Sequence, residues 1–340
     1  MDIATLEKYD SQKMYKIYDE WPDIARKAFE TNQESIHFED IDHIVFAGMG
    51  GSGAIGDIFS AILSKSEIHV SLIKGYLLPK TVNKNTLVIV TSVSGNTLET
   101  LAILDSARKM NCKLIAFSSG GKIEKRCKNN QILFRKIPFF HSPRTSLINY
   151  TYSILNILNS LFPIGKKEIL DSLAELKIIK KQIDSNNLSN SNPAINLAKW
   201  INGIPMIYYP HGLQSAAIRF KSSLQENAKT HVIIEDVIET CHNGIVSWEK
   251  QSTVQPIMIQ GQEDYIKTKE RFEIIKEFFK KENIEFKEIH TGAGNILTKI
   301  ICLIYLFDYT SIYLAVLIKT DPSPVLSIDY IKSKLNTSDQ

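Results

Sequence analysis

The sequence lacks an excess of charge of either sign. Its 40 Lys and Arg residues nearly balance its 37 Asp and Glu residues, so the formal net charge is +3 over 340 residues. A dedicated nucleic-acid-binding protein needs clustered Lys and Arg to displace counterions from the phosphate backbone. The charge balance therefore argues against that class. Disorder is excluded as well, because 44% of the residues are hydrophobic and only 23% are charged.

Paired cysteines are also missing. The four cysteines lie far apart, without a CxxC spacing: Cys112, Cys127, Cys241 and Cys302. This pattern favours neither a disulfide framework nor a zinc knot, and it indicates a reducing compartment. The first residues contain no basic stretch followed by an apolar one, so we expect no secretory signal and a cytoplasmic protein.

Metal-binding spacings are absent too. The eight histidines form no HxH or HExxH pattern, and no carboxylates cluster beside them. Zinc sites on helices commonly use such spacings. The sequence therefore predicts no bound metal, and we expect no other cofactor.

One long apolar stretch, residues 296–318, has the length of a membrane span. Lys299 and Asp308 interrupt it, which leaves apolar runs shorter than the ~20 residues that a span requires. We expect this stretch to form a buried core helix.

Short apolar strands alternate with helical segments in two parts of the chain. In the first part the expected strands are 43–47, 68–72, 86–90, 113–117 and 132–137. In the second part they are 205–209, 232–235, 256–260 and 286–290. This alternation predicts an α/β fold in which parallel sheets are covered by helices on both faces.

A polar run at 184–193 offers almost nothing to bury and is expected to lie at a domain boundary. The predicted organisation is a helical lead-in (1–40), a first α/β subdomain (41–183), a linker (184–195), a second α/β subdomain (196–320) and a C-terminal helical segment (321–340).

A glycine-rich turn follows the first expected strand. Gly48, Gly50 and Gly53 match the GxGxxG pattern of dinucleotide-binding folds. That pattern also needs an acidic residue at the end of the second strand, where this sequence has Ser71-Leu72-Ile73-Lys74. The spacing GxxxxGK[ST] of nucleoside-triphosphate sites is absent. The turn therefore favours neither class of nucleotide.

The turn after the third expected strand contains four hydroxyl side chains: Thr91, Ser92, Ser94 and Thr97. Backbone N–H groups at the start of the following helix favour an anion, and neutral hydroxyls can donate to phosphate oxygens. The alternative is a helix cap, with Asn96 at the N-cap and Glu99 bonding back. A cap explains one or two polar residues but not four hydroxyls, so the pattern favours a phosphate site.

These two turns resemble the sugar isomerase (SIS) domain. The strings that carry the resemblance are Gly48-Met49-Gly50-Gly51-Ser52-Gly53 and Thr91-Ser92-Val93-Ser94-Gly95-Asn96-Thr97-Leu98-Glu99-Thr100. Three further segments are similar to the bifunctional phosphoglucose/phosphomannose isomerase family: Pro143-Arg144-Thr145-Ser146-Leu147, the stretch from Arg219-Phe220-Lys221 to Glu226-Asn227-Ala228-Lys229, and the stretch from Asp321-Pro322 to Ile331-Lys332. The resemblance covers residues 44–335. It implies two SIS-type subdomains, each a parallel β-sheet flanked by helices in an αβα sandwich.

The resemblance also implies a function. The family members are metal-independent aldose–ketose isomerases that interconvert glucose 6-phosphate and mannose 6-phosphate with fructose 6-phosphate through a cis-enediol. The expected phosphate-binding residues are Gly51, Ser52, Ser92, Ser94 and Thr97. Two alternatives share the fold. A non-catalytic sugar-phosphate-binding regulator usually has a basic recognition helix, which the lead-in lacks. An amino-sugar phosphate isomerase usually has a glutaminase domain that begins at a free cysteine, whereas this sequence begins Met1-Asp2.

The resemblance implies that Glu226 is the base, because moving a proton between adjacent carbons requires a positioned carboxylate. Without the resemblance, a helical glutamate beside a lysine would be a solvated surface residue. His242 is expected to assist ring opening, in a homodimer where it reaches the neighbouring subunit's site. Its alternative is a histidine in a polar turn. The family usually has Glu where this chain has Gly244, which bears on how His242 is positioned.

Two cationic residues complete the expected site. The resemblance implies that Lys332 helps ring opening, whereas a C-terminal helical lysine is otherwise a solvated charge that suits the helix dipole. Arg144 is expected to stabilise the anionic enediolate, since a fixed guanidinium lowers such a barrier electrostatically. A structural ion pair is the alternative for Arg144.

Overall fold

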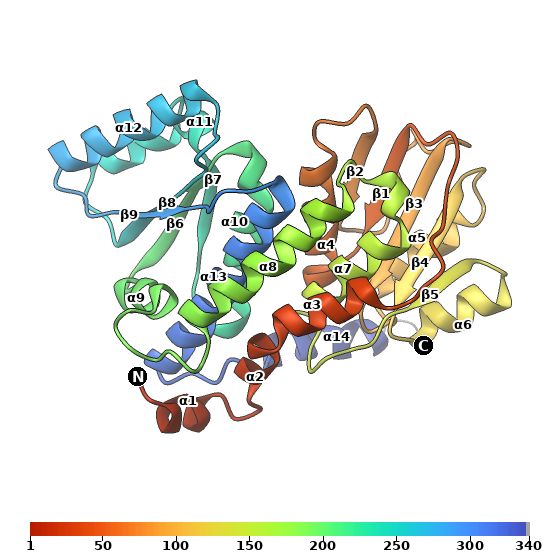
Figure 1. The fold of residues 1–340 in the computed structure, drawn as a ribbon, viewed down its shortest axis with the longest axis horizontal. Coiled ribbons are helices and arrows are strands. Elements are labelled where there is room, and N and C mark those ends of the chain that lie inside the picture. Colours follow the sequence, from red (N-terminus) through yellow and green to blue (C-terminus); the bar gives the residue numbers. More distant parts are fainter. Residues whose placement is uncertain (338–340) are drawn as a thin grey trace.

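The computed structural model describes residues 1–337, in which nine strands form two parallel sheets (Figure 1). The first sheet has the strand order β2-β1-β3-β4-β5, and the second has the order β7-β6-β8-β9. Every neighbouring pair of strands is parallel. Helices flank both sheets, so the predicted two-part α/β fold is confirmed.

The strand bounds agree with the sequence prediction to within two residues at each end. The first sheet contains β1 (His43–Ala47), β2 (His69–Ile73), β3 (Thr86–Ser92), β4 (Lys113–Ser118) and β5 (Leu133–Lys136). The second sheet contains β6 (Ile204–Tyr209), β7 (Ile233–Asp236), β8 (Val254–Gln260) and β9 (Lys287–His290). Strands β1 and β3 are buried at every position because they lie inside a sheet that is covered on both faces.

Each sheet has an outer layer of helices on one face. Helices α5 (Leu98–Ala107) and α6 (Gly121–Asn129) pack on the first sheet. Helices α11 (Val237–Thr240) and α12 (Ile266–Lys281) pack on the second. Each outer layer has a hydrophobic core of its own, separate from the rest of the molecule.

The other faces of the two sheets share a single core. It is built from α4 (Gly50–Leu63), α7 (Leu147–Ile157), α8 (Lys166–Ile183), α9 (Pro193–Trp200), α10 (Gln214–Asn227) and α13 (Ile296–Leu317). Phe46 of the first sheet and Ile257 of the second both belong to this core. The two halves are therefore joined by a common inner layer of helices. The predicted domain boundaries stay a prediction.

Helix α13 lies in the centre of this inner layer (Figure 1). Among the described residues it is the one helix long and apolar enough to cross a membrane, but 89% of its most apolar stretch is buried inside the protein. The expectation of a buried core helix at 296–318 therefore agrees with the structure.

The lead-in forms α1 (Ile3–Tyr9), α2 (Met14–Asp19) and α3 (Trp21–Glu30), and it belongs to the shared core. The Trp21 ring stacks on Tyr305 of α13, with ring centroids 5.5 Å apart. The Trp21 Nε1–H donates to the carbonyl of Thr145 at 2.9 Å. The lead-in thus fixes the segment that precedes α7.

The polar loop between α8 and α9 is anchored rather than exposed throughout. Asp184 and Asn192 are 4% and 0% exposed. The Asn192 side chain accepts from the N–H groups of Ala194 and Ile195, and it donates to the carbonyls of Ile183 and Asn187. A run with few apolar residues is therefore buried through side-chain amide hydrogen bonds, which hydrophobic patterning does not reveal.

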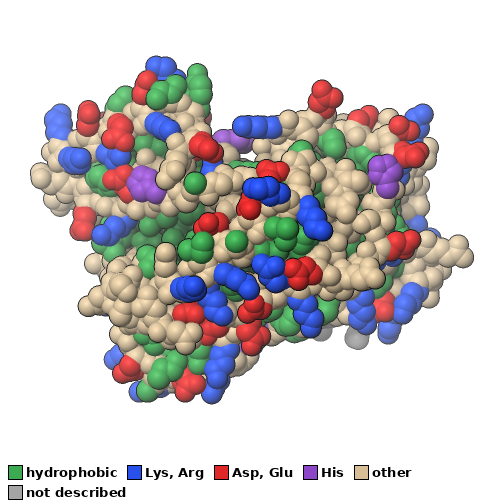
Figure 2. All heavy atoms as spheres, in the orientation of Figure 1, with side chains coloured by type: hydrophobic (Ala, Val, Ile, Leu, Met, Phe, Trp, Pro, Cys, Tyr) green, Lys and Arg blue, Asp and Glu red, His purple; other side chains and the backbone are tan. Residues whose placement is uncertain are grey.

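The remaining elements are short or terminal. Three 3-10 helices span Asn159–Leu161, His211–Leu213 and Gly244–Glu249, and α14 spans Leu326–Thr337. Figure 2 shows Lys and Arg side chains interspersed with Asp and Glu on the face that it presents, in agreement with the balanced composition.

We expect Asn192→Ala to lower the free energy of unfolding by about 2–4 kcal/mol. The substitution removes the cap of α9, leaves the half-buried carbonyl of Asn187 without its donor and takes one of two donors from the buried carbonyl of Ile183, which keeps the Tyr313 hydroxyl. The matched control is Asn190→Ala in the same loop, where the side chain is exposed and bonds to Lys199, and its cost should stay below about 0.5 kcal/mol. Urea unfolding followed by circular dichroism measures both values. Equal losses would mean that the loop is not anchored through Asn192.

Candidate active site

The glycine turn lies at the carboxyl end of β1 and leads directly into α4, which begins at Gly50. A side chain at Gly48 would place its Cβ 2.8 Å from the backbone of Ser52, so the turn closes only around glycine. The Ser52 hydroxyl is nearly buried and accepts a hydrogen bond from the N–H of Val93 at 3.1 Å. Strands β1 and β3 are neighbours in the first sheet. The bond therefore joins the turn that follows β1 to the turn that follows β3.

The hydroxyl-rich turn at the end of β3 is folded around Ser92. Its hydroxyl accepts from the N–H of Gly95 at 3.2 Å and donates to the Thr97 hydroxyl at 3.1 Å. Gly95 has φ of +70°, and a Cβ there would lie 1.8 Å from the carbonyl oxygen of Gly120. The chain can therefore turn this tightly only at glycine. Ser94 remains exposed at the rim.

The helix cap that was the alternative to a phosphate site, with Asn96 at the N-cap of α5, does not form. Thr97, not Asn96, occupies the N-cap position, and its side chain makes no capping bond. The Asn96 amide instead accepts from the N–H of Lys122 at 3.0 Å and donates to the carbonyl of Ser94. The first turn of α5 thus has backbone N–H groups without a side-chain cap, next to the hydroxyls of Ser94 and Thr97, which is an arrangement suited to an anion.

Arg144 lies against the glycine turn. A Cβ at Gly51 would be 3.1 Å from the carbonyl oxygen of Pro143 and 3.4 Å from the Cα of Arg144, so the helix start and this segment are in close contact. Arg144 is 5% exposed, and its Nη1 donates to the Glu226 carboxylate at 3.1 Å. The structure therefore brings together two of the four predicted catalytic residues.

The turn at residues 321–324 holds the other side of the Arg144 guanidinium. Its Nη2 donates to the carbonyls of Pro322 at 2.8 Å and Ser323 at 2.9 Å. Sequence reasoning did not assign these carbonyls to the site, because backbone acceptors have no side-chain signal. The Asp321-Pro322 and Ser323-Pro324 dipeptides indicate only that a turn forms there.

Glu226 lies in the last turn of α10, with its side chain 25% exposed. It lines a groove of about 670 Å³ that is bounded by the end of α10 and the start of α14. The other residues around the groove are Ser222, Gln225, Lys229, Thr230, His231 and residues 324–328. The carboxylate thus has an ion-pair partner on one side and open space on the other, as a residue that contacts a ligand requires.

Lys229 joins the end of α10 to the C-terminal turn. Its Nζ donates to the carbonyls of Glu226 at 2.6 Å and Pro324 at 2.9 Å. Partial burial lowers the pKa of Lys229, and the charge of Arg144 lowers that pKa further. Lys229 and Arg144 therefore hold the 321–324 turn from two sides.

His141 is a further neighbour of Arg144 that sequence reasoning missed. Neither of its buried ring nitrogens has a hydrogen-bond partner among the described residues. Burial lowers the pKa of His141, and the charge of Arg144 lowers that pKa further. The ring is therefore neutral near pH 7 and adds no second positive charge beside Arg144.

In the described part of the chain, neither His242 nor Lys332 bonds to Arg144 or Glu226. Both side chains are exposed, and neither has a hydrogen bond or ion pair in the described part of the chain. At Gly244 a Cβ would lie 2.4 Å from a carboxylate oxygen of Glu235, which also accepts from the Thr240 hydroxyl. The space beside Gly244 is thus occupied by the Glu235 carboxylate.

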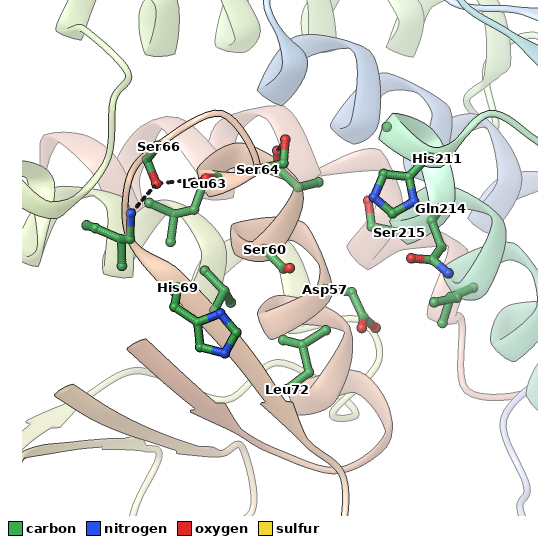
Figure 3. A pocket seen from close by; sticks show the side chains of 15 residues that line it. Asp57, Ser60, Leu63, Ser64, Ser66, His69, Leu72, His211, Gln214 and Ser215 are labelled. Atoms are coloured by element: carbon green, nitrogen blue, oxygen red, sulfur yellow. Dashed lines mark hydrogen bonds between the residues drawn. The ribbon is translucent and has the colours of Figure 1, made fainter. Parts of the chain in front are cut away.

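A second cavity, of about 310 Å³, lies between the two halves (Figure 3). His69 and Asp57 line it on the side of the first sheet, and His211 and Ser215 line it near the start of α10. It shares no lining residue with the groove at Glu226. Among residues 1–337, no group of three His, Cys, Asp or Glu side chains is placed to hold a metal ion.

Comparison with known proteins matches two family models to this chain. The SIS domain matches residues 37–157, and the C-terminal SIS domain of bacterial phospho-glucose isomerase matches residues 190–335. A bifunctional phosphoglucose/phosphomannose isomerase of Caldicellulosiruptor bescii is 32% identical over 92% of this chain and 96% of its own length. A protein of the same name from Aquifex aeolicus is 28% identical over 95% of this chain and 98% of its own.

Two further similarities bear on how far the fold determines the reaction. A D-glucosamine-6-phosphate 4-epimerase of Sulfolobus acidocaldarius is 27% identical over 72% of this chain and 77% of its own. The crystal structure of a hypothetical protein from Thermus thermophilus superposes with a TM-score of 0.70 at 12% identity, covering 99% of this chain and 90% of that one. The structural likeness supports the fold alone.

Proposed function

Because the chain belongs to the family of bifunctional phosphoglucose/phosphomannose isomerases, we propose that it interconverts glucose 6-phosphate and mannose 6-phosphate with fructose 6-phosphate. A sugar-phosphate aldose–ketose isomerase is the function class that this membership supports. The observation that carries the proposal is the Arg144–Glu226 ion pair, in which Glu226 lines an open groove and the backbone of Arg144 lies against Gly51 of the glycine turn.

The phosphate of the substrate binds at the two turns. Ser52 and Ser92 are tied into the backbone of these turns, so they set the shape of the site. Ser94 and Thr97 remain as hydroxyl donors beside the uncapped start of α5. Gly51 allows Arg144 to approach the same place, which brings the phosphate site next to the reacting residues.

Glu226 is the general base of the isomerisation. Its carboxylate takes the proton from C2 of the aldose and returns it to C1, while the proton of the C2 hydroxyl passes to the C1 oxygen, so that a cis-enediol lies between the two sugars. Protonation of the enediol on one face of C2 gives glucose 6-phosphate, and protonation on the other face gives mannose 6-phosphate. One base serves both aldoses when the enediol turns each face of C2 in turn towards Glu226.

Arg144 stabilises the charge that moves during this step. The guanidinium faces the Glu226 carboxylate at 3.1 Å. When Glu226 takes the proton, its negative charge passes to the enediolate oxygens of the substrate. A fixed guanidinium beside both groups balances this negative charge before and after the proton moves, which lowers the barrier.

His242 opens the sugar ring from the neighbouring subunit of a homodimer, and Lys332 assists it. Exposed apolar residues flank His242, since Ile233 is 43%, Ile238 37% and Val246 58% exposed. Such residues around an unpartnered histidine support a subunit contact at this surface. All four cysteines are free, which supports a reducing compartment, and we place the enzyme in the cytoplasm.

The alternatives remain testable with the same substrates. A relative named D-glucosamine-6-phosphate 4-epimerase makes an amino-sugar phosphate a reasonable second substrate class. A non-catalytic sugar-phosphate regulator has no need for a carboxylate that is paired to arginine on one side and open to a groove on the other.

We expect the wild-type enzyme to convert glucose 6-phosphate and mannose 6-phosphate, but not glucosamine 6-phosphate, in the presence of a chelator. Glu226→Gln keeps the shape of the side chain and loses its basicity. Turnover should therefore fall by roughly 10²–10⁴-fold with little change in substrate binding. Coupled spectrophotometric assays and incorporation of deuterium from D₂O at C2 measure the loss.

The matched control is Glu239→Gln, a glutamate that is exposed and bonds to Asn243 near His242. This variant should retain its turnover. If Glu239→Gln is the inactive variant and Glu226→Gln keeps more than about a tenth of the turnover, the base is Glu239.

We expect the double substitution Ser94→Ala/Thr97→Ala to raise the KM for glucose 6-phosphate at least roughly tenfold while kcat changes much less. Each hydroxyl lost from a charged phosphate removes about 1.5–3 kcal/mol of binding. The control is Ser106→Ala, whose hydroxyl is exposed near the other end of α5. An unchanged KM in the double variant would move the phosphate to another site.

Mixing two inactive variants tests the shared site. Glu226→Gln and His242→Ala should each be inactive, but hybrid dimers contain one site in which both residues are intact. Activity should therefore return after subunit exchange, towards a quarter of the wild-type value for random pairing of equal amounts (order of magnitude). If exchange is demonstrated by mass spectrometry and activity does not return, the two residues act in the same chain.

A further inference from the structure

A buried ion pair lies behind the proposed active site. Arg219 of α10 and Asp308 of α13 are 1% and 0% exposed. The Arg219 Nε and Nη2 donate to the Asp308 carboxylate at 3.0 Å and 2.6 Å. The Ser223 hydroxyl donates to the same carboxylate at 2.5 Å. Several donors therefore hold the Asp308 carboxylate in the middle of a buried core helix.

Arg219 also reaches the backbone of the active site. Its Nη2 donates to the carbonyl of Arg144 at 2.9 Å. The next carbonyl, that of Thr145, accepts from the Trp21 indole at 2.9 Å. Two buried donors from different helices therefore fix consecutive peptide groups at the point where the Arg144 side chain leaves the backbone.

The same face of α10 carries both Arg219 and Glu226. Arg219, Ser223 and Glu226 follow one another at intervals of four and three residues, which places them along one side of a helix. A shift or rotation of α10 against α13 would move the Glu226 carboxylate. Asp308 thus holds two parts of the site through Arg219. One is the backbone of Arg144, and the other is helix α10, which carries Glu226.

Stability alone does not require charges at these positions. Removing two charges from water is costly, and replacing a buried ion pair by apolar side chains of similar volume is often neutral or stabilising. An apolar pair would fill the space between α10 and α13 but could not donate to the Arg144 carbonyl. The feature that distinguishes Arg219 from an apolar residue is therefore its bond to the active-site backbone.

We propose that Arg219 and Asp308 are positioning residues for the isomerisation, and that they hold the Arg144 guanidinium against the Glu226 carboxylate. This inference rests on the proposed function. The pair contacts no substrate; it acts through the peptide group of Arg144 and through α10. Since a misplacement of about 1 Å at reacting groups costs up to roughly 10²-fold in rate, loss of the pair lowers kcat more than it changes KM.

The experiment replaces the pair by apolar residues in the full-length enzyme. R219M/D308L should fold with a circular dichroism spectrum close to that of the wild type, at a lower thermal midpoint, because the Arg144 carbonyl and the Ser223 hydroxyl lose their buried partners. Its kcat should fall at least roughly tenfold, while KM for glucose 6-phosphate changes less than about threefold. R219K is the second variant, because lysine keeps the charge beside Asp308 but lacks the planar fork that serves two acceptors. It should show the same split between kcat and KM.

A matched control removes another ion pair from the second half. Lys276 and Glu288 pair at 2.9 Å, with side chains 11% and 32% exposed, between α12 and β9. K276M/E288L should keep wild-type kcat. Arg144→Lys already disturbs the residue through which the pair acts. When R219M/D308L is added to an enzyme that carries Arg144→Lys, kcat should fall by less than about threefold further, because effects through a shared residue are not additive.

The outcomes separate the two proposals. If the wild type converts none of the sugar phosphates, the proposed function fails. If the wild type is active and Arg144→Lys lowers its rate, but folded R219M/D308L and R219K both keep kcat within about twofold, the pair is merely structural and the inference is overturned. Full additivity with Arg144→Lys would overturn it too, since the pair would then act independently of Arg144.

Discussion

Both sheets are covered on both faces, and each buries one of them against the same shared layer of helices. Helix α13 lies in the middle of this layer, and the lead-in helices α1–α3 complete it. The shared layer places the carboxyl end of β1 in the first half near the end of α10 in the second, through the 143–145 segment. The candidate site depends on this constraint, because its parts come from segments that local structure alone would not bring together.

The Arg144 guanidinium joins these segments. The guanidinium bonds to Glu226 from the second half and to the carbonyls of Pro322 and Ser323 from the C-terminal turn. The backbone of Arg144 lies against Gly51 in the first half. Each of these contacts fixes the position of the guanidinium at the edge of the groove. Arg144 therefore belongs to a structural ion pair, which was the alternative considered for it. It is also the candidate for stabilising an enediolate, and the two roles are compatible.

Membership in the isomerase family and the geometry of the groove support the same class of chemistry, but the fold does not determine the reaction by itself. A relative named as a 4-epimerase is similar over much of the chain, and solved structures of a glucosamine-fructose-6-phosphate aminotransferase domain and of a glucosamine-6-phosphate deaminase have a similar fold. What argues for isomerisation is a carboxylate that can reach a ligand from beside a fixed positive charge. The substrate's identity then depends on the walls of the groove.

The sequence alone was sufficient for features that depend on local burial and on turn chemistry. Alternating apolar strands predicted β1 to β9 closely, and Gly48 and Gly95 marked turns that only glycine can adopt. The structure adds that β1 and β3 are neighbours and that the bond between Ser52 and Val93 joins the two turns. Hydrophobic periodicity reports which face of an element is buried, so these parts of the fold were predictable.

Only the tertiary structure decided what packs against that buried face. The ion pair between Arg144 and Glu226, the backbone acceptors at Pro322 and Ser323, and the burial of the loop at Asn192 all depend on how separate helices meet. The resemblance suggested roles for Arg144 and Glu226 but not their contact. Pairings between distant segments leave no periodic signal in one sequence, because a polar side chain has the same pattern whether it faces water or a buried partner.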